Sequence, residues 1–393
     1  MELTLTPRAL RGTVAAIPSK SQAHRLLLCA AFADRETELT LSAANQDIES
    51  TAACLRALGA EIKRTETGYL IRPIKTLPEK AELPCRESGS TLRFLLPVVG
   101  ALGVDATFQM EGRLPKRPLS PLWEEMERMG CCLSRPTETT VRCQGRLRSG
   151  HYRIDGGVSS QFITGLLYAL SLLPESSRLE CTGKLESAPY IDMTRQALAR
   201  FGLRSQGETI PGGQHLKSPG CLPVEGDWSN AAFFLGANVL GSQVAVTGLD
   251  PFSSQGDRAC VALFEQLQQF TTISAADIPD LVPILAVVAG AQRGAVFTDA
   301  GRLRLKESDR LQSVAAMLTA LGGDAAVTAD GLIVRGTGYR GGVVDAAGDH
   351  RIAMAAAIAA TVCTAPVTIR GAEAVSKSYP GFWADYASLG GIL

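Results

Sequence analysis

The chain has 393 residues, of which 46% are hydrophobic and 20% charged, so it can build two or three domains with sizeable cores. Lys and Arg together number 39, as do Asp and Glu, and this zero net charge argues against a nucleic-acid or anionic-membrane partner. Because no stretch approaches about 18 apolar residues without a charge or a breaker, we expect no membrane span.

The N-terminal residues, the cysteines and the histidines predict a cytoplasmic protein without a metal. Residues 1–4 are typical of a strand rather than of a signal peptide. The 10 cysteines include no Cys-x-x-Cys pair, and several lie in apolar helical patterns, so we expect reduced thiols in the core. The 4 histidines show no metal-ligand spacing, and we therefore expect no zinc site.

The first element with a chemical signature is the polar turn from Pro18 to Arg25, which leads into an apolar run. Ser19 and Ser21 are good N-cap residues, so a helix should begin near Ser21. Its first turn would offer unpaired N–H groups and the positive end of the helix dipole, with Lys20 and Arg25 beside it. This pattern predicts a phosphate or carboxylate site, while the alternative is a capped surface helix with solvated charges.

The same kind of helix start recurs along the chain, which predicts a sixfold repeat. Successive starts lie 70, 70, 68, 52 and 70 positions apart, at Pro18–Ser21, Ser88–Thr91, Val158–Gln161, Gly226–Ser229, Ile278–Leu281 and Gly348–Arg351. A second signal shares this period, because a glycine suited to a helix C-terminus recurs at Gly59, Gly130, Gly202, Gly322 and Gly390. Hairpins are expected at 61–72 and 325–335. Six units of roughly 65 residues suit two domains of three units, with a cleft between them as a common place for a ligand.

Further helix starts and loops in the first half carry polar groups suited to an anionic ligand. Gly89–Arg93 joins a glycine, two hydroxyls and a cation, and Arg113–Pro118 places three cations in a proline-stiffened loop before a helix expected over 121–129. Ser159–Gln161 exceeds what capping alone requires, and Ser187–Asp192 forms a polar loop after a strand. Ordinary capping and a solvated basic loop are the alternatives.

The second half contains the sharpest charged cluster, Lys306–Arg310, which opens a helix expected over 311–321. It is either a surface ladder of ion pairs or a carboxylate held among cations for proton transfer. Asp280 heads an apolar helix, and an N-cap role alone would explain it. Asp349–Arg351 and Ser376–Pro380 add charge at other turns. Together these cations would match ligands with about three to five negative charges, such as two phosphates with carboxylates.

In this order, the motifs resemble the 5-enolpyruvylshikimate-3-phosphate synthase family from residue 18 to residue 380. The carriers are Pro-Ser-Lys-Ser at 18–21 with Arg25, Gly-Ser-Thr-Leu-Arg at 89–93, Arg-Pro at 117–118, Val-Ser-Ser-Gln-Phe at 158–162, Pro-Tyr-Ile-Asp at 189–192, Lys-Glu-Ser-Asp-Arg at 306–310, Asp-His-Arg at 349–351 and Lys-Ser-Tyr-Pro at 377–380. The resemblance implies an α/β fold of two similar domains, each of three βαβαββ units with buried parallel helices, and an active site in the interdomain cleft. Domain I would comprise 1–17 and 225–393, domain II would comprise 18–224, and the crossovers would lie near 17–20 and 211–225.

The resemblance also implies a reaction. The enolpyruvyl group of phosphoenolpyruvate would pass to the 5-hydroxyl of shikimate 3-phosphate with release of phosphate, without metal or organic cofactor, in a monomer whose partners are these small molecules. Glyphosate would compete for the phosphoenolpyruvate half, where Gly89 leaves room for it. The catalytic residues would be Lys20, Asp280 and Glu307, with Asp280 accepting the hydroxyl proton and Glu307 protonating the methylene carbon.

Carried over by motif, the substrate-binding residues form two groups. Shikimate 3-phosphate would be bound by Lys20, Ser21, Arg25, Ser159, Ser160, Gln161, Ser187, Tyr190, Asp280 and Lys306. Phosphoenolpyruvate would be bound by Lys20, Gly89, Arg117, Gln161, Arg310, His350, Arg351 and Lys377.

Two positions depart from the family pattern, because Glu87 and Arg302 stand where many members have asparagine. Glu87 must turn away from a bound anion or pair with Arg86 or Arg93. One alternative function is the sister transferase that acts on UDP-N-acetylglucosamine, but that family carries a cysteine in the loop corresponding to 112–117, and this loop has none. Another is a non-catalytic module that binds a phosphorylated ligand, against which Lys20, Asp280 and Glu307 argue.

Overall fold

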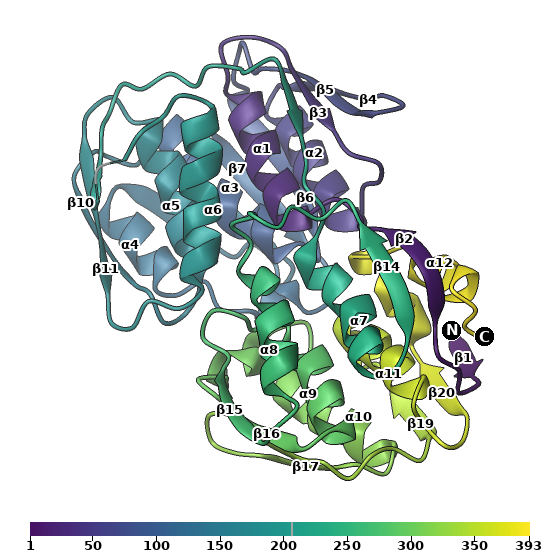
Figure 1. Cartoon of the computed structure of the whole chain (residues 1–393). Helices are drawn as coiled ribbons and strands as arrows, with labels where there is room; N and C mark the ends of the chain where they lie inside the picture. The colour runs from purple at the N-terminus through teal and green to yellow at the C-terminus, as the bar shows by residue number, and fades with distance from the viewer. Residues whose placement is uncertain (206) are drawn as a thin grey trace. The chain divides into compact units, whose positions relative to one another are not determined.

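The computed structural model describes residues 1–205 and 207–393, which form two compact units (Figure 1). The continuous unit is Pro18–Val224, and the split unit combines Met1–Ile17 with Glu225–Leu393. Both units mix helices with small sheets, so the expected α/β class is confirmed.

In the continuous unit, helices alternate with strands that form separate small sheets. Its elements are α1 (Lys20–Ala31), β3 (Thr37–Thr40), α2 (Gln46–Ala57), β4 (Glu61–Arg64), β5 (Gly68–Arg72), β6 (Lys80–Arg86), α3 (Gly89–Leu102), β7 (Asp105–Met110), η1 (Leu114–Lys116), α4 (Leu122–Arg128), β8 (Cys131–Ser134), β9 (Thr140–Gly145), β10 (His151–Asp155), α5 (Ser160–Ser171), β11 (Ser177–Thr182), α6 (Ala188–Arg200), β12 (Thr209–Ile210) and β13 (Cys221–Pro223). The strand orders are β13-β3-β5-β4, β6-β7-β9-β8 and β10-β11-β12.

The split unit repeats this plan with shorter sheets. Its elements are β1 (Glu2–Leu5), β2 (Arg11–Ala15), α7 (Trp228–Val239), β14 (Gln243–Thr247), η2 (Gly256–Ala259), α8 (Cys260–Gln266), β15 (Thr271–Ser274), α9 (Val282–Ala291), β16 (Gly294–Thr298), η3 (Gly301–Leu305), α10 (Arg310–Ala320), β17 (Asp324–Val327), β18 (Leu332–Arg335), β19 (Gly342–Asp345), α11 (His350–Ala360), β20 (Val367–Arg370), η4 (Ala372–Lys377) and α12 (Phe382–Ser388). The strand orders are β15-β16-β18-β17, β1-β20-β19 and β14-β2.

The sheets share a pattern of pairing, which is the structural counterpart of the sequence repeat. Each contains one parallel pair, namely β13/β3, β6/β7, β10/β11, β14/β2, β15/β16 and β19/β20. The expected hairpins are present, because β4 pairs antiparallel with β5 and β17 pairs antiparallel with β18. The N-terminal strands complete two sheets of the split unit, since β1 pairs with β20 and β2 pairs with β14.

Six helices begin at the recurring polar starts, as the sequence predicts. Side chains cap the N-termini of α1, α3, α5, α7 and α11, through Ser19, Ser88, Ser159, Asp227 and Asp349. All five recurring glycines adopt positive φ just after a helix, which only glycine does without strain. Each helix of the repeat then runs into a core, and almost every residue of α3, α5, α9 and α11 is buried.

Close approach of helices positions their starts within each unit. In the continuous unit α3 packs against α5, and α6 packs against both α1 and α5 (Figure 1). Gly165 makes the first contact possible, because a Cβ there would strike the Arg93 carbonyl and the Pro97 ring. In the split unit α7, α9 and α11 pack against one another.

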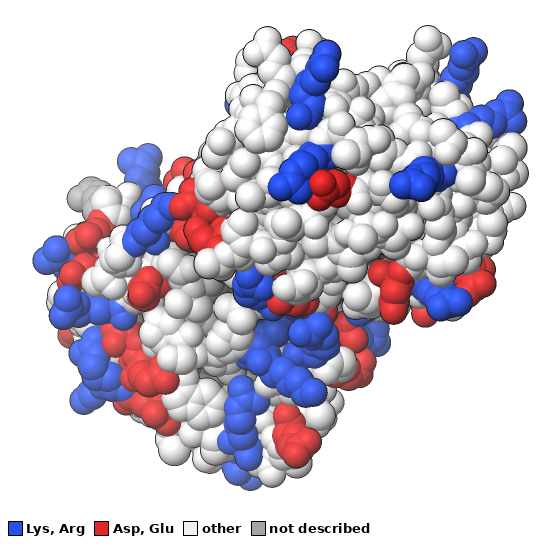
Figure 2. Space-filling model, turned by 90° about the horizontal axis from the view of Figure 1, so that it is seen from below, with Lys and Arg blue, Asp and Glu red and all other residues white. Residues whose placement is uncertain are grey.

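On the face shown in Figure 2, basic and acidic side chains are interspersed in one part, and a broad area carries few charges. Among residues 1–205 and 207–393, no helix combines the length and the apolar character needed to cross a bilayer. The 10 cysteines are all free thiols, as the absence of a Cys-x-x-Cys pair predicts.

Candidate functional site

The candidate residues fall into one group in each unit. The continuous unit carries Lys20, Ser21, Arg25, Gly89, Arg117, Ser159, Ser160, Gln161, Ser187 and Tyr190, and the split unit carries Asp280, Lys306, Glu307, Arg310, His350, Arg351 and Lys377. Within each unit these residues stand at the starts of helices or in the loops before them.

Lys20 is the first residue of α1, whose N-cap Ser19 accepts from the backbone N–H of Gln22 at 3.4 Å. Its Nζ donates to Oδ2 of Asp47 at 2.9 Å, and each side chain is about one-fifth exposed. Asp47 lies in the first turn of α2, so α2 orients the ammonium beside the exposed N–H groups of α1.

Arg25 lies one turn further along α1 and is only 3% exposed. Its guanidinium donates to the carbonyl oxygens of Ser21 at 2.6 Å and Tyr190 at 2.8 Å, and to Oγ1 of Thr194 at 2.9 Å. It also lies over the ring of Phe94, 5.2 Å from the centroid. Because its partners are neutral oxygens and a ring, Arg25 keeps its positive charge at the junction of α1 with α6.

The start of α3 brings Gly89 against two guanidinium groups. A Cβ at Gly89 would lie 2.8 Å from Nη1 of Arg117 and 2.9 Å from Nη1 of Arg93, so an added methyl group would have to displace these guanidinium groups. Arg93 donates to Oε1 of Gln161 at 2.8 Å and to the Pro118 carbonyl at 3.1 Å. Arg93 therefore fixes both the glutamine of α5 and the loop that carries Arg117.

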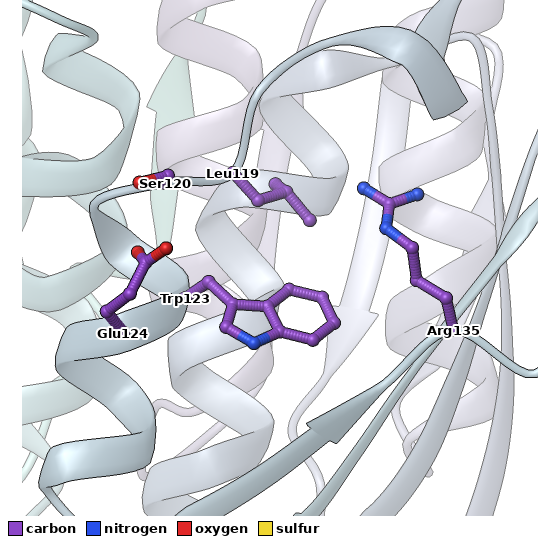
Figure 3. Close-up of a pocket in the computed structure, with 5 residues that line it drawn as sticks. All are labelled: Leu119, Ser120, Trp123, Glu124 and Arg135. Atoms are coloured by element: carbon purple, nitrogen blue, oxygen red, sulfur yellow. The ribbon is translucent and has the colours of Figure 1, made fainter.

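The basic loop is also held by a residue directly after β8. Arg135 donates to the Pro115 carbonyl at 3.2 Å and lies over the ring of Trp123. A pocket of about 430 Å³ lies directly after this loop. Figure 3 shows that Trp123 and Arg135, which line it, face Leu119. The helix expected over 121–129 is α4, which begins at Leu122.

The starts of α5 and α6 supply hydroxyl groups. Ser159 caps α5 and accepts from the backbone N–H of Gln161, while Ser160 is the first helical residue. The Gln161 amide also donates to Oγ of Ser90 at 3.0 Å, which ties α5 to the first turn of α3. Ser187 precedes α6 with φ of 57° and makes no side-chain cap, and this conformation is uncommon for a residue with a Cβ.

The split unit holds a compact cluster around Arg310, which is 1% exposed. Its guanidinium contacts Oδ2 of Asp349 at 2.9 Å, Oδ1 of Asp280 at 2.8 Å and Oε2 of Glu307 at 2.6 Å. Burial alone would lower the pKa of Arg310, but these carboxylates outweigh it and raise the pKa above its ordinary value. The alternative of a surface ion-pair ladder is therefore wrong for Arg310.

The positions of two helix starts decide between the alternatives for this cluster. α9 begins at Val282 with Leu281 as N-cap, so Asp280 lies outside the helix and is not its cap. α10 begins at Arg310 itself with Asp309 as N-cap, so Lys306 and Arg310 are not helical neighbours. They meet instead through Asp280, whose Oδ1 lies 3.3 Å from the Lys306 ammonium.

The ammonium group of Lys306 has a pKa well below that of an ordinary lysine. Burial lowers the pKa of its ammonium to about 8, and Arg310 adds to this shift, while Asp280 and Glu307 oppose it. The group therefore changes charge just above neutral pH, unlike an ordinary lysine.

The remaining candidate residues of the split unit lie beside the same cluster. Arg351 contacts Oδ2 of Asp280 at 3.3 Å and donates to its carbonyl oxygen at 3.0 Å. His350 is the first residue of α11 and is 2% exposed. Lys377 ends η4 and donates to the carbonyl oxygen of Gly348 at 3.2 Å, directly before the Asp349 cap.

Glu87 and Arg302, the two positions that depart from the family pattern, each contact a specific backbone segment. The Glu87 carboxylate lies against Gly112, where φ is 55° and a Cβ would strike it. Arg302 donates to the Ala276 carbonyl and thereby holds the loop before α9.

Sequence reasoning missed two acids of the split unit. Asp257, in η2, is buried, and burial together with Asp280 raises its pKa to about 6, while Arg351 opposes the shift. Asp349 was noticed only as part of a charged triplet, yet it is 0% exposed and pairs with Arg310, 39 positions away. A polar residue in a Gly-Asp step was the only available signal for Asp257.

In the part of the chain that the structure describes, no three His, Cys, Asp or Glu side chains gather in a way that could hold a metal ion. The chemical capacity of the two groups lies in their cations and carboxylates. The group in the continuous unit offers helix N-termini with the cations Lys20, which pairs with Asp47, and Arg25, whose partners are neutral oxygens. The group in the split unit offers carboxylates among cations.

Comparison with known proteins identifies the family. The chain matches the sequence model of EPSP synthase (3-phosphoshikimate 1-carboxyvinyltransferase) over residues 5–274 and 264–386. It is 39% identical to the 3-phosphoshikimate 1-carboxyvinyltransferase of Clostridium kluyveri, over 100% of this chain and 98% of that one, and 38% identical to that of Clostridium perfringens, over 100% and 99%. The fold is similar to the EPSP synthase of Acinetobacter baumannii, with a TM-score of 0.81, 23% identity and coverage of 99% and 98%. The chain therefore belongs to the EPSP synthase family.

Proposed function

We propose that this chain transfers the enolpyruvyl group of phosphoenolpyruvate to the 5-hydroxyl of shikimate 3-phosphate. The observation that carries the proposal is the division of chemistry between the units. The continuous unit presents cations at the starts of α1 and α3 and hydroxyl groups at the start of α5, suited to phosphorylated ligands. The split unit presents acids beside a cation cluster, suited to moving protons.

Shikimate 3-phosphate binds mainly to the continuous unit. Ser21, Ser159, Ser160, Ser187 and Tyr190 supply polar contacts, and Arg25 supplies positive charge at the α1–α6 junction. Lys306 and Asp280 reach the ligand from the split unit, with Asp280 at the reacting hydroxyl.

Phosphoenolpyruvate binds where cations of both units converge. Lys20, Arg117 and the first backbone N–H groups of α3 hold its phosphate, and Gly89 permits the close approach. Gln161 bridges the two substrates, and the split unit contributes Arg310, His350, Arg351 and Lys377. This assembly requires the two units to form a cleft around both ligands.

In the addition step, Asp280 accepts the proton of the 5-hydroxyl while the hydroxyl oxygen bonds to C2 of phosphoenolpyruvate. Glu307 gives a proton to C3, which becomes a methyl group in a tetrahedral adduct. In the elimination step, Glu307 takes a methyl proton back, the C–O bond to phosphate breaks, and Lys20 protonates the leaving phosphate. The surrounding cations stabilise the charge that gathers on the phosphate oxygens.

A phosphate-release assay tests the function. Phosphate should appear only when phosphoenolpyruvate and shikimate 3-phosphate are both present, and UDP-N-acetylglucosamine should not replace the acceptor. Activity with UDP-N-acetylglucosamine alone would favour the sister transferase, and binding without turnover would favour a non-catalytic module.

Small-angle scattering tests the cleft separately. Opposed cations should keep the empty units apart, and the dianionic ligand should draw them together. The radius of gyration should fall when shikimate 3-phosphate binds, and an unchanged radius would contradict closure.

A further inference from the structure

A chain of buried hydroxyl groups joins the middle of α1 to the start of α3. Nδ1 of His24 lies 2.7 Å from Oγ1 of Thr51, which lies 2.7 Å from Oγ1 of Thr91. Thr91 in turn donates to Oγ of Ser88, the N-cap of α3, at 2.7 Å. All four side chains are at most 1% exposed, so no bulk water competes for these bonds.

The hydrogen bonds of this network have one consistent donor-to-acceptor direction, from His24 to Ser88. Since Thr91 gives its proton to Ser88, the proton between the two threonines must come from Thr51, and the proton on Thr51's other side must come from Nδ1 of His24. Nε2 of His24 is buried without a hydrogen-bond partner, which suits a lone pair better than an N–H donor. Desolvation, reinforced by Lys20 and Arg25, lowers the pKa of His24 well below its ordinary value, so the ring is neutral.

The His24–Thr51 hydrogen bond of this network is the second of two side-chain contacts between α1 and α2. Lys20 pairs with Asp47, and one helical turn further on His24 meets Thr51. From Thr51 the chain passes to Thr91 and Ser88, directly before Gly89. Both ends of this network therefore adjoin groups assigned above to the phosphate of phosphoenolpyruvate.

The start of α3 lies close to two guanidinium groups. The Gly89 backbone packs so closely on Arg117 and Arg93 that a single Cβ would be 2.8 and 2.9 Å from their guanidinium nitrogens. A small tilt of α3 would change two distances at once, from its first N–H groups to Arg117 and from the same groups to Lys20.

A second hydroxyl network lies on the other side of α1. Arg25 donates to Oγ1 of Thr194 at 2.9 Å, and Thr194 lies 2.9 Å from Oγ1 of Thr164. This network joins α1 to α5 and α6, which carry groups assigned to shikimate 3-phosphate. Each substrate thus has its own buried hydroxyl network.

We propose that His24, Thr51 and Thr91 are positioning residues that hold the start of α3 at a fixed distance from Lys20, so that both address the same phosphate of phosphoenolpyruvate. The proposal rests on the proposed function, because it needs Lys20 and Gly89 in that half of the site. It assigns no catalytic role to His24.

The test compares Thr51→Val and Thr91→Val with Thr194→Val in steady-state kinetics, because each change removes one hydroxyl from one network. Thr51→Val and Thr91→Val should raise the KM for phosphoenolpyruvate about tenfold and leave the KM for shikimate 3-phosphate within about twofold. Thr194→Val should show the opposite selectivity. Ser171→Ala, which removes a buried hydroxyl bonded to the Leu167 carbonyl near the other end of α5, should change neither constant.

Substitution of His24 sharpens the test. His24→Asn places an amide N–H near the former Nδ1 and should restore a KM for phosphoenolpyruvate close to that of the unmodified protein, whereas His24→Leu should not. The proposal is overturned if Thr51→Val changes both KM values equally, or if it lowers only the melting temperature. An unmodified protein that releases no phosphate would refute the proposed function instead.

Discussion

Arg25 and Arg310 are both buried guanidinium groups, 3% and 1% exposed, but they have opposite surroundings. Arg25 donates to carbonyl and hydroxyl oxygens, whereas Arg310 faces three carboxylates. Burial lowers the pKa of Arg25, while carboxylates overcome burial and raise that of Arg310. The continuous unit therefore retains positive charge for an anion, and the split unit balances its charge and keeps acids oriented.

The largest effect should come from breaking the charge balance of the split unit. Asp349→Asn preserves an N-cap for α11 but leaves the Arg310 charge undercompensated, so the free energy of unfolding should fall by about 3–5 kcal/mol. Thr194→Val, which removes a neutral partner of Arg25, should cost only about 1 kcal/mol. Denaturant unfolding measures both, and equal losses would show that the two environments do not differ as described.

The second effect concerns proton transfer. Glu307→Gln should lower kcat about a hundredfold or more, because the amide cannot exchange the C3 proton. Asp309→Asn is the matched control, since Asp309 is a nearby carboxylate that caps α10 and pairs with Arg304. Turnover of Glu307→Gln within about threefold of the unmodified protein would remove Glu307 from its proposed role.

The third effect concerns the anion-binding half. Gly89→Ala would push a methyl group against Arg117 and Arg93, so the KM for phosphoenolpyruvate should rise about tenfold. Gly381→Ala is the control, because a Cβ there meets nothing nearer than 3.8 Å. If Gly89→Ala alters only the KM for shikimate 3-phosphate, the division of the substrates in the continuous unit is wrong.

The smallest effect is a pH dependence. Because the pKa of Lys306 is about 8, its ammonium loses its proton as the pH rises past 8, and kcat/KM for shikimate 3-phosphate should fall about fourfold between pH 7 and 8.5. Lys306→Arg stays charged and should lose this alkaline decline. A decline that persists in Lys306→Arg must come from another group.

The sequence allowed the fold class and the helix starts to be predicted because their signals are local. A serine or aspartate cap followed by an apolar run, and a glycine with positive φ at the helix end, depend on neighbouring residues only. The alternative that Asp280 is only a helix cap is wrong, since Pro279-Asp280 is locally typical of a cap while the helix begins at Val282.

Long-range pairing explains what the sequence could not predict. The contact of Arg310 with Asp349 and the burial of Asp257 depend on how α10, α11 and η2 meet, and no local pattern encodes that meeting. Membership of the family was accessible because eight motifs occur in order, although each is weak alone. The site assignments carried over with those motifs remain predictions that the variants above test.

The pairing of β1 with β20 in the split unit has a consequence for synthesis on the ribosome. β1 pairs with β20 across residues 5 and 367, and Thr6 bonds to the Ile392 carbonyl, so the marked chain ends lie close together (Figure 1). At translation rates of about 5–20 residues per second, the first strand waits roughly 20–70 s for its partner, while the continuous unit is already complete. During that interval the backbone groups of β1 lack the partners that β20 supplies in the folded unit.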